Sequence, residues 1–470
     1  SPRVFSRDGS KAMGSDSKPY EKLVSWDGRY SDYYMINTSN GKRTKIVEQT
    51  ANRPSPSPSG RYMMHFGDDY KWYLIETAGM SKKRLTLSRH IQWENELEDR
   101  PQAARAYGVV GWTQGEEAVL INDRYDIWKF VIKTNKVTCV TNLFGRQNKI
   151  VLRYSKFDLE GDDDEIDADN RSYIPNNMWL SAKNERTKDS GYYIASVVEP
   201  GDPKKVVMSE DAIGGVTRAK KAERIFFTLS DFDRYPDVWV AGMDFSNQRQ
   251  LTDACPEQRA VRWGSSELVN WTNSDGLALQ GYLVKPEGFD PKKKYPMMVY
   301  FYERNSDRVH SYVRPTPGTS PNAAYYVSNG YLWFVPDIVY TVGYPGESAE
   351  KCVISGVQHL IARGYVNKKA IGMAGHSWGG YQTAHLATRS NLFAAAESGA
   401  PVSNMFSAYG GIRYQTGMSR QFQYEKTQSR IGGTPWEYPQ RYWQNSPVFY
   451  ADRVQTPMLI LHNDNDGAVP

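Results

Sequence analysis

The sequence is poor in cysteine and in long apolar runs. Its three cysteines, Cys139, Cys255 and Cys352, are odd in number and far apart, so they predict neither a disulfide framework nor a cysteine metal site. No run approaches the roughly 18 apolar residues of a membrane-spanning helix. The chain opens on polar residues, without the apolar stretch of a signal peptide. These absences leave the cellular compartment open.

The chain also has no large excess of positive or negative charge. The 58 Lys plus Arg and 53 Asp plus Glu leave a net charge of +5 over 470 residues, which is too weak to indicate a nucleic acid or an anionic membrane as a partner. Aromatic residues are abundant, at 13% of the chain. They exclude a disordered or collagen-like chain and favour β-structure, and the length predicts two or three domains.

A loose repeat fills residues 1–255. Each copy passes from a turn into an aromatic and β-branched strand, then through a second turn into a basic stretch. Copies recur roughly every 40–55 residues, the period of a four-stranded propeller blade. The five copies contain, in chain order, Asp32, Trp72, Trp128, Tyr193 and Trp239. We predict a β-propeller, with an ordinary β-sandwich as the alternative.

An acidic run extends from Asp158 to Asp169. The glycine and glutamate pattern of a calcium-binding EF-hand is missing, so we interpret the run as a solvated loop between strands. No metal and no organic cofactor are expected for this protein.

After residue 255 the pattern becomes that of an α/β domain. Two strands around the turn 273–276 predict a hairpin. Apolar residues at helical spacing over 353–361, closed by Gly364, predict a crossover helix. Continuous apolar runs, typical of buried parallel strands, occupy residues 296–302, 331–335, 370–374, 393–396 and 458–461.

A nucleophile motif follows one of these strands. The strand 370–374 leads directly into Gly375-His376-Ser377-Trp378-Gly379, and a helical pattern continues from there. In this context the serine occupies a strained turn and its hydroxyl projects above the sheet. Ser377 is therefore the predicted nucleophile, and a structural turn serine is the alternative. The predicted fold class is a β-propeller (1–255) followed by an α/β-hydrolase domain with a mostly parallel, doubly wound sheet (256–470).

Serine needs a histidine base and a carboxylate that orients the base. In this fold the acid follows the serine in the chain, just past a buried strand. The strand 457–462 ends in a turn that contains Asp464 and Asp466, so either carboxylate is a candidate for the acid. A solvated turn of acids and amides is the alternative.

No histidine follows Asp466. Of the seven histidines, His376, His385 and His462 lie nearest to these motifs in the sequence, and we interpret all three as structural residues. We therefore expect the catalytic histidine to lie beyond Pro470.

The run from Gly375 to Tyr381 resembles the Gly-x-Ser-x-Gly-Gly-Tyr motif of the prolyl oligopeptidase family of serine peptidases, in which a β-propeller precedes an α/β-hydrolase domain. The segment from His462 to Pro470 is similar to that family's His-Gly-x-x-Asp-x-x-Val-Pro, and this register selects Asp466 as the acid. The resemblance also implies seven or eight blades. We therefore expect the chain to be a fragment that lacks propeller at its start.

Two donors are expected to stabilise an oxyanion. The elbow geometry provides the backbone N–H of Trp378, the residue after the nucleophile. The run Lys294 to Tyr302 resembles the segment that carries an oxyanion-binding tyrosine in the dipeptidyl-peptidase branch, which implies this role for Tyr302. A core or surface tyrosine is the alternative.

The resemblance extends to a substrate pocket. Ala400-Pro401-Val402-Ser403 is similar to the segment that begins the pocket for the residue before the cleaved bond, which implies that Met405, Phe406 and Tyr409 line it. These side chains could equally belong to the core. The acidic pair with which dipeptidyl peptidases bind a substrate N-terminus has no recognisable counterpart, so the choice between exopeptidase and endopeptidase stays open.

The resemblance implies a serine peptidase that acts on short peptides and whose propeller restricts access. Association into homo-oligomers, or with the rest of the same polypeptide, is a further expectation. A carboxylesterase or carbohydrate esterase is the second hypothesis, because the same elbow serves esters. A catalytically inactive scaffold, whose propeller binds a partner, is the third.

Overall fold

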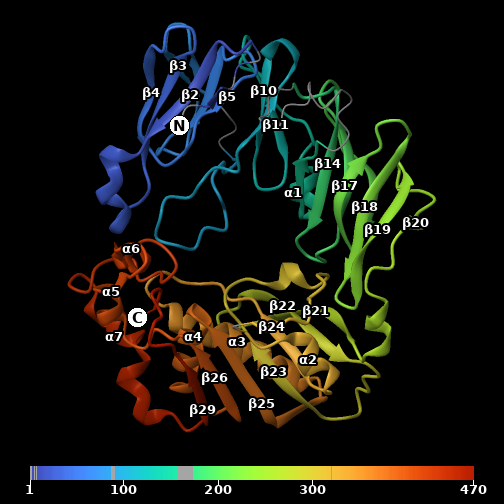
Figure 1. Cartoon of the computed structure of the whole chain (residues 1–470), viewed down its shortest axis with the longest axis vertical. Helices are drawn as coiled ribbons and strands as arrows, with labels where there is room; N and C mark the ends of the chain where they lie inside the picture. Colours follow the sequence, from blue (N-terminus) through green and yellow to red (C-terminus); the bar gives the residue numbers. More distant parts are fainter. Residues whose placement is uncertain are drawn as a thin grey trace.

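The computed structural model describes residues 3–4, 6, 8–85, 90–156, 173–318 and 320–469. Across these residues, five four-stranded antiparallel sheets precede one seven-stranded sheet. Figure 1 shows the five small sheets as an arch above the large sheet. The acidic run from Asp158 to Asp169, which the sequence predicts as a loop, lies outside the described residues.

The five small sheets are meanders, in which each strand pairs with its neighbours in the sequence. The first three sheets consist of β1 (Arg3–Val4), β2 (Lys11–Asp16), β3 (Ser31–Asn37) and β4 (Arg43–Thr50); β5 (Ser55–Pro56), β6 (Tyr62–Phe66), β7 (Trp72–Glu76) and β8 (Ser81–Arg84); and β9 (Val109–Trp112), β10 (Ala118–Asn122), β11 (Ile127–Val131) and β12 (Val137–Cys139). The other two consist of β13 (Ile150–Tyr154), β14 (Asn177–Asn184), β15 (Ser190–Ser196) and β16 (Lys204–Ser209); and β17 (Ala212–Arg218), β18 (Arg224–Asp231), β19 (Arg234–Gly242) and β20 (Arg249–Gln250).

Each predicted repeat copy corresponds to one of these sheets. Asp32 lies in β3, Trp72 in β7, Trp128 in β11, Tyr193 in β15 and Trp239 in β19. In β15 every second residue is buried, the period-2 pattern of a strand that packs one face against a neighbour. Five separate sheets, rather than the two of a sandwich, confirm the β-propeller.

The seven-stranded sheet has the order β21-β22-β24-β23-β25-β26-β29. Its β21–β22 hairpin is antiparallel, as is the β22–β24 pair, and the other pairs are parallel. The strands are β21 (Gly264–Thr272), β22 (Ala278–Pro286), β23 (Tyr295–Tyr300), β24 (Leu332–Pro336), β25 (Val366–His376), β26 (Ala395–Gly399) and β29 (Met458–Leu461). The predicted hairpin and the predicted mostly parallel sheet are confirmed.

Helices cover both faces of this sheet. Alternate residues of one strand enter different cores: Phe334 of β24 packs with α3 (Pro345–Ala362) and α4 (Trp378–Ala387), whereas Val335 packs with α2 (Ala323–Ser328). Burial on both faces explains why these strands are continuous apolar runs. The predicted crossover helix is α3, and the doubly wound α/β-hydrolase domain is confirmed.

The last strand differs from its prediction. β29 pairs in parallel with β26, but Leu459, Ile460 and Leu461 are each more than half exposed. β29 is the outermost strand described at this edge, so only one neighbouring strand covers it. The prediction of a buried strand is therefore wrong for these three residues.

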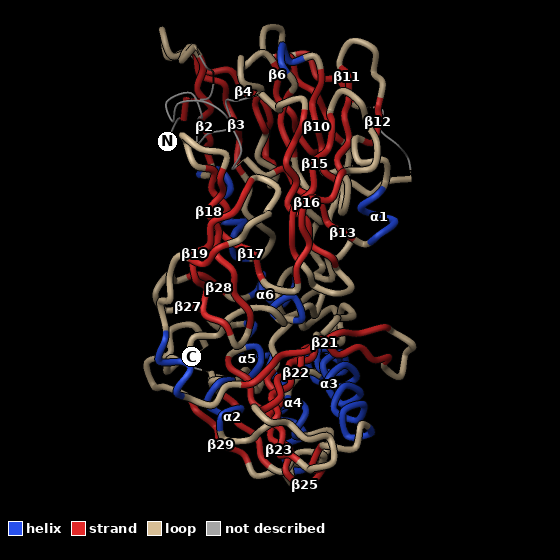
Figure 2. Tube along the Cα trace, turned by 90° about the vertical axis from the view of Figure 1, so that its right-hand side faces the viewer, coloured by secondary structure: helices blue, strands red, loops and turns tan. Residues whose placement is uncertain are grey.

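The remaining elements are short. In the propeller half they are η1 (Lys18–Ser25), η2 (Gln114–Glu116) and α1 (Phe144–Asn148), and η3 (Pro256–Ala260) lies in the connection to β21. In the other half they are η4 (Ser306–Arg308), α5 (Met405–Tyr409), β27 (Ile412–Arg413), β28 (Met418–Ser419), α6 (Gln421–Glu425), α7 (Pro439–Gln444) and η5 (Pro447–Arg453). Figure 2 shows most helices in the lower lobe. Among the described helices, none has the length and apolarity to cross a membrane.

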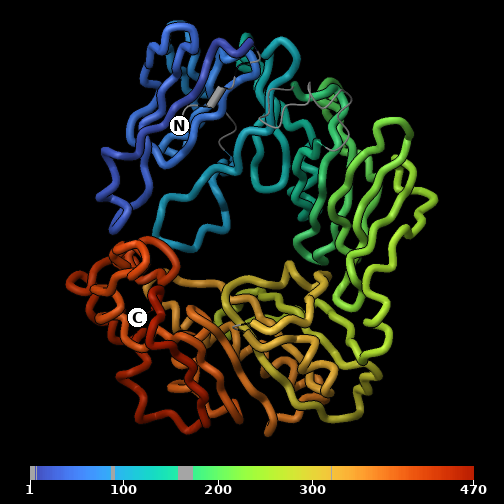
Figure 3. The backbone as a smooth tube through the Cα atoms, viewed as in Figure 1, coloured from blue at the N-terminus to red at the C-terminus, as the bar shows by residue number. Residues whose placement is uncertain are grey.

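The two halves meet at both ends of the arch. On one side the chain passes from β20 through η3 to β21. The predicted division between residues 255 and 256 falls just before η3 and stays a prediction. On the other side η1 of the first sheet contacts α6 of the second half. Figure 3 shows these two segments, far apart in the sequence, at the same edge of the molecule.

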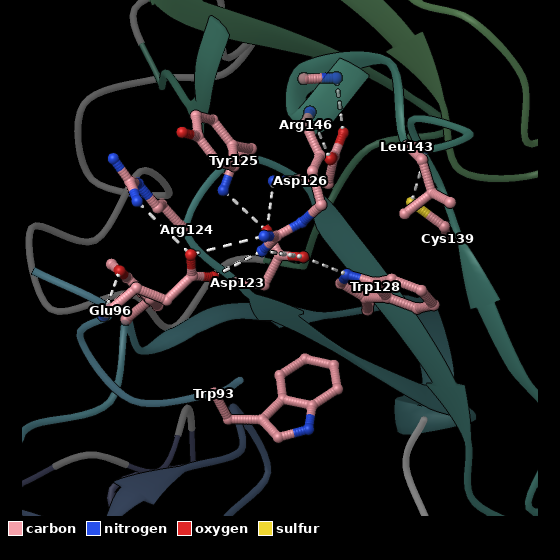
Figure 4. A network of polar contacts seen from close by, with 12 residues as sticks. Trp93, Glu96, Asp123, Arg124, Tyr125, Asp126, Trp128, Cys139, Leu143 and Arg146 are labelled. Carbon is pink, nitrogen blue, oxygen red and sulfur yellow. Dashed lines mark hydrogen bonds and ion pairs between the residues drawn. The ribbon is translucent and has the colours of Figure 1, made fainter. Parts of the chain in front are cut away.

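A polar network anchors the segment 90–107 to the third sheet (Figure 4). Glu96 of this segment pairs with Arg124 at 3.4 Å and with Arg146 at 2.7 Å. Arg146 also pairs at 3.4 Å with Asp123, which is fully buried and accepts hydrogen bonds from two backbone N–H groups and the Trp128 indole. A buried carboxylate without such partners would cost much free energy of folding, so the network is expected to stay intact. It therefore fixes the part of the segment around Glu96 against the third sheet.

Candidate active site

Ser377 occupies a sharp turn between β25 and α4. Its backbone angles, φ 58° and ψ −114°, are strained for a residue with a side chain. The turn is held by the Ser377 N–H, which donates to the Gly399 carbonyl of β26 at 2.8 Å. Strand, strained turn and helix are arranged as the sequence predicts for a nucleophile.

Two glycines explain how this turn packs. A Cβ atom at Gly375 would lie 2.4 Å from the carbonyl group of Gly379, and one at Gly380 would lie 2.2 Å from the Gly399 carbonyl oxygen. Both distances are far inside van der Waals contact, and the atoms met belong to the backbone. Only glycine therefore allows α4 to approach β25 and β26 this closely, and this approach places Ser377 at the top of the sheet.

The two predicted oxyanion donors lie beside this turn. Trp378 is the first residue of α4, where backbone N–H groups have no partner within the helix. Tyr302 follows β23, whose Tyr300 pairs with Ala374 of β25, so the two strands end side by side. The Tyr302 ring is 3.5 Å from the position of a Cβ atom at Gly379. The two residues predicted to supply these donors therefore both lie near the start of α4.

The backbone of Tyr302 is tied to α4. Its carbonyl accepts hydrogen bonds from the Tyr340 hydroxyl at 3.0 Å and from the Gln382 side chain at 3.1 Å. The Tyr340 hydroxyl in turn accepts from the Trp378 indole at 3.1 Å and from Gln382. Tyr340 and Gln382 are buried, so these bonds are shielded from water and fix Tyr302 relative to the turn.

The Tyr302 hydroxyl has a partner that the sequence analysis missed. Gln428 Nε2 donates to this hydroxyl at 2.9 Å. The two residues are 126 positions apart, and Gln428 belongs to no recognisable motif. Because an amide nitrogen only donates, the phenol oxygen accepts here and keeps its own proton for another acceptor.

Asp466 lies in the turn after β29. Its Oδ1 accepts the backbone N–H groups of Ala468 at 2.8 Å and Val469 at 2.9 Å. The Val469 bond contributes most to lowering the pKa of this carboxyl below its usual value, and the nearby His462 and His376 act in the same direction. Asp464 is exposed, and its carboxylate contacts the Asn465 amide at 3.4 Å. Of the two candidates, Asp466 is the one held by backbone donors.

The three histidines near these motifs have distinct surroundings. His385 is buried in α4, and this burial lowers its pKa to about 3, so it is neutral at physiological pH. Nε2 of His462 bonds to the Val469 carbonyl at 2.7 Å. His376 is half-buried, beside the nucleophile. Among the described residues, no histidine forms a hydrogen bond to the Ser377 hydroxyl.

The predicted pocket residues begin α5. Met405 and Tyr409 are buried in the main core, and Phe406 packs against the same core. The Tyr409 hydroxyl donates to Glu425 at 2.6 Å, and burial with this bond raises the pKa of Tyr409. Substrate contact by these three residues stays a prediction.

A salt bridge joins the propeller to this region. Asp99, in the segment 90–107, accepts from Arg430 Nε at 3.0 Å and Nη2 at 2.8 Å. The Arg430 guanidinium also pairs with Glu303 at 3.1 Å, and it lies 4.0 Å from the centroid of the Tyr340 ring. The Arg430 side chain is 4% exposed. The propeller therefore contacts, through one buried guanidinium, the tyrosine that holds the Tyr302 backbone.

Comparison with known proteins places this geometry in a family. Residues 346–470, which contain the turn, α4 and the acid, match the model of the prolyl oligopeptidase family. In this part the chain is similar to the prolyl oligopeptidase family. The resemblance seen in the sequence is confirmed.

Curated relatives of this chain carry peptidase names. An uncharacterized peptidase of Bacillus subtilis, YuxL, is 24% identical over 220 residues, which cover 43% of this chain and 31% of the relative. A probable chloroplastic glutamyl endopeptidase of Arabidopsis thaliana is 25% identical over 224 residues, which cover 43% of this chain and 21% of the relative. The chain thus matches about a third or less of the length of these relatives.

Solved structures share the fold over nearly the whole of this chain. A putative dipeptidyl aminopeptidase IV from Bacteroides ovatus superposes with a TM-score of 0.65 at 18% identity, over 99% of this chain and 69% of that one. The dipeptidyl peptidase 4 of Porphyromonas gingivalis superposes with a TM-score of 0.64 at 17% identity, over 97% of this chain and 65% of that one. At these identities the likeness supports the propeller–hydrolase fold of this chain and no more.

Proposed function

We propose that this protein is a serine peptidase that hydrolyses peptide bonds of short peptides through an acyl-enzyme. The observation that carries the proposal is the strained Ser377 turn, beside which Tyr302 and the Trp378 N–H lie. A nucleophile between a buried strand and a helix N-terminus, with two hydrogen-bond donors beside it, is suited to acyl transfer. The peptidase names of the relatives support an amide as the substrate bond.

The reaction needs two steps. In the first, Ser377 Oγ bonds to the substrate carbonyl carbon and its proton passes to a histidine, while Tyr302 and the Trp378 N–H donate to the oxyanion. The carbon–nitrogen bond then breaks, and the amine leaves with that proton. In the second step, water attacks the carbonyl carbon of the acyl-enzyme. The bond from this carbon to Ser377 Oγ then breaks, Ser377 regains a proton, and the carboxylic acid leaves as the second product.

Asp466 is the proposed acid that orients this histidine. Its lowered pKa keeps the carboxylate charged at neutral pH, as is required to stabilise an imidazolium. We place no histidine of residues 1–470 in the role of the base, since none of the described histidines bonds to Ser377.

The propeller is proposed to restrict the substrate to oligopeptides. The Asp99–Arg430 salt bridge supports this role, because it holds a propeller segment beside the residues that fix Tyr302. We propose residues 1–255 as this propeller unit and residues 256–470 as the catalytic unit, in which Met405, Phe406 and Tyr409 line the substrate pocket.

Turnover by the full-length protein tests the proposed reaction class. Peptide amides of two to about ten residues would be compared with aryl and acetyl esters, for the wild-type protein and for Ser377→Ala. We expect amide hydrolysis that Ser377→Ala reduces by roughly 10⁴-fold or more. Turnover of esters alone would instead identify an esterase, and the absence of any turnover that depends on Ser377 would favour a scaffold.

A further inference from the structure

We propose that Arg413, Gln423 and Gln428 form a directional chain of hydrogen bonds that aims the Tyr302 hydroxyl proton at the oxyanion. Arg413 Nη2 donates to Gln423 Oε1 at 3.1 Å, and Gln423 Nε2 donates to Gln428 Oε1 at 3.0 Å. Gln428 Nε2 donates to the Tyr302 hydroxyl at 2.9 Å. The three are positioning residues for the reaction, and this inference rests on the proposed function.

The chemistry of arginine sets the direction of this chain. A guanidinium has five N–H donors and no acceptor, so the atom of Gln423 that faces Arg413 must be its amide oxygen. The Gln423 amide nitrogen then faces Gln428, whose oxygen must accept. This leaves the Gln428 nitrogen toward Tyr302. Each amide is thus oriented by the one before it, and the phenol oxygen at the end has to accept.

The surroundings keep the chain in place. Gln423 is buried, and its backbone carbonyl accepts the Ser429 N–H at 3.0 Å, which closes the turn that carries Gln428. The buried Arg430 donates to the Gln428 carbonyl at 2.8 Å. Arg413 belongs to β27, which pairs with β28. The links therefore lie between fixed backbone segments, shielded in part from water.

This direction matters for catalysis. A phenol oxygen that accepts a hydrogen bond from an N–H group does not donate its own proton to that group. The phenol proton is therefore available for a hydrogen bond to the substrate oxygen. Hydrogen bonds in series also polarise one another, which strengthens the last donor in the chain. The oxyanion forms only in the transition state, so the chain should act on kcat and leave KM nearly unchanged.

Two substitutions of Gln428 separate the effect of hydrogen-bond direction from the effect of side-chain shape. In the full-length protein we expect Gln428→Ala to lower kcat roughly 3- to 10-fold, the effect of one neutral hydrogen bond. Glutamate has the shape of glutamine, but its carboxylate accepts and would draw the Tyr302 proton away from the substrate. We expect Gln428→Glu to lower kcat roughly 10²-fold, near the value for Tyr302→Phe. The exposed Gln358→Glu adds the same charge elsewhere and should change kcat less than about twofold.

A double-mutant cycle tests whether the new carboxylate at position 428 acts through the Tyr302 hydroxyl or repels the oxyanion directly. If the chain acts through the Tyr302 hydroxyl, Gln428→Glu in the Tyr302→Phe background should lower kcat less than about twofold further. Simple repulsion of the oxyanion would persist in that background. Arg413→Leu should also lower kcat a few-fold, and Arg413→Lys, which keeps a group that only donates, should restore most of it.

The outcomes are distinct. The chain is supported if kcat falls from wild type to Gln428→Ala to Gln428→Glu while KM stays within about twofold, and if the Gln428 effect vanishes without the Tyr302 hydroxyl. It is overturned if Gln428→Glu is as active as Gln428→Ala, or if the loss persists in the Tyr302→Phe background. Wild-type turnover that does not depend on Ser377 would overturn the proposed function, and the chain with it.

Discussion

The proposed nucleophile and the proposed acid lie in contrasting parts of the same domain. Ser377 follows a buried strand and begins a buried helix, in a turn where glycines bring backbone against backbone. Asp466 follows β29, an exposed edge strand, in a turn that is itself partly exposed. The backbone of the first residue is held by the closely packed strand and helix on either side of it, and the carboxylate of the second is held by two backbone N–H groups.

The contrast follows from what each residue has to do. A strained backbone persists only where the surrounding structure over-determines it, so the Ser377 turn needs rigid neighbours. An orienting carboxylate needs only to stay charged and to face its histidine. Hydrogen bonds from backbone N–H groups keep it charged, because they stabilise the ionised form. We therefore expect the Ser377 turn to be sensitive to shape and the Asp466 turn to be sensitive to charge.

The largest effect is expected when the carboxylate charge of Asp466 is removed. Asp466→Asn keeps the shape of the side chain but cannot stabilise an imidazolium, so we expect kcat to fall roughly 10⁴-fold in the full-length protein. The matched control is Asp464→Asn, which should change kcat less than about twofold. Equal losses in both variants would show that the turn as a whole, rather than Asp466, supports catalysis.

A methyl group added to each turn tests the sensitivity to shape. Gly380→Ala would place a Cβ atom 2.2 Å from the Gly399 carbonyl oxygen, so we expect it to lower the free energy of unfolding by about 1 to 3 kcal/mol or more. A Cβ atom at Gly467, in the Asp466 turn, would meet its nearest atom at an ordinary 3.5 Å. Denaturant unfolding of Gly467→Ala should therefore match wild type within about 0.5 kcal/mol. A larger cost at Gly467 than at Gly380 would reverse the comparison.

The smallest expected effect is the pH dependence of the acid. Because folding lowers the pKa of Asp466, its contribution to stability is fully present above the ordinary aspartate value, about 3.9, and is lost as pH falls through the lower folded value. The difference in unfolding free energy between wild type and Asp466→Asn should be constant from pH 7 to about 5 and shrink below about 4. A difference that grows toward acid pH would contradict the hydrogen bonds assigned to Asp466.

Much of the fold could be predicted from the sequence, because periodicity reports burial within one element. Alternation in strands such as β15 and continuous apolar runs such as β24 identify the two sheet types. The prediction was wrong at Leu459 to Leu461, because the burial of an apolar run depends on what lies beside it. Sequence periodicity carries no information about which strand is at the edge.

The candidate site could be predicted only where its residues are neighbours in the chain. The elbow and the acid turn are short motifs, and their geometry follows from adjacent residues. Gln428 meets Tyr302 across 126 residues and Arg430 meets Asp99 across 331, and no local sequence pattern links either pair. Such contacts arise from tertiary packing, and only the structure reveals them.

The central claim is that Ser377 is an activated nucleophile, and covalent labelling tests it most directly. The full-length protein would be treated with a fluorophosphonate probe, and the modified residue would be identified by mass spectrometry of its peptides. We expect the label on Ser377, its loss in Ser377→Ala, and unchanged labelling in Ser403→Ala, which removes an exposed serine of the same domain. Equal labelling of wild type and Ser377→Ala, or a label on another serine, would contradict the account.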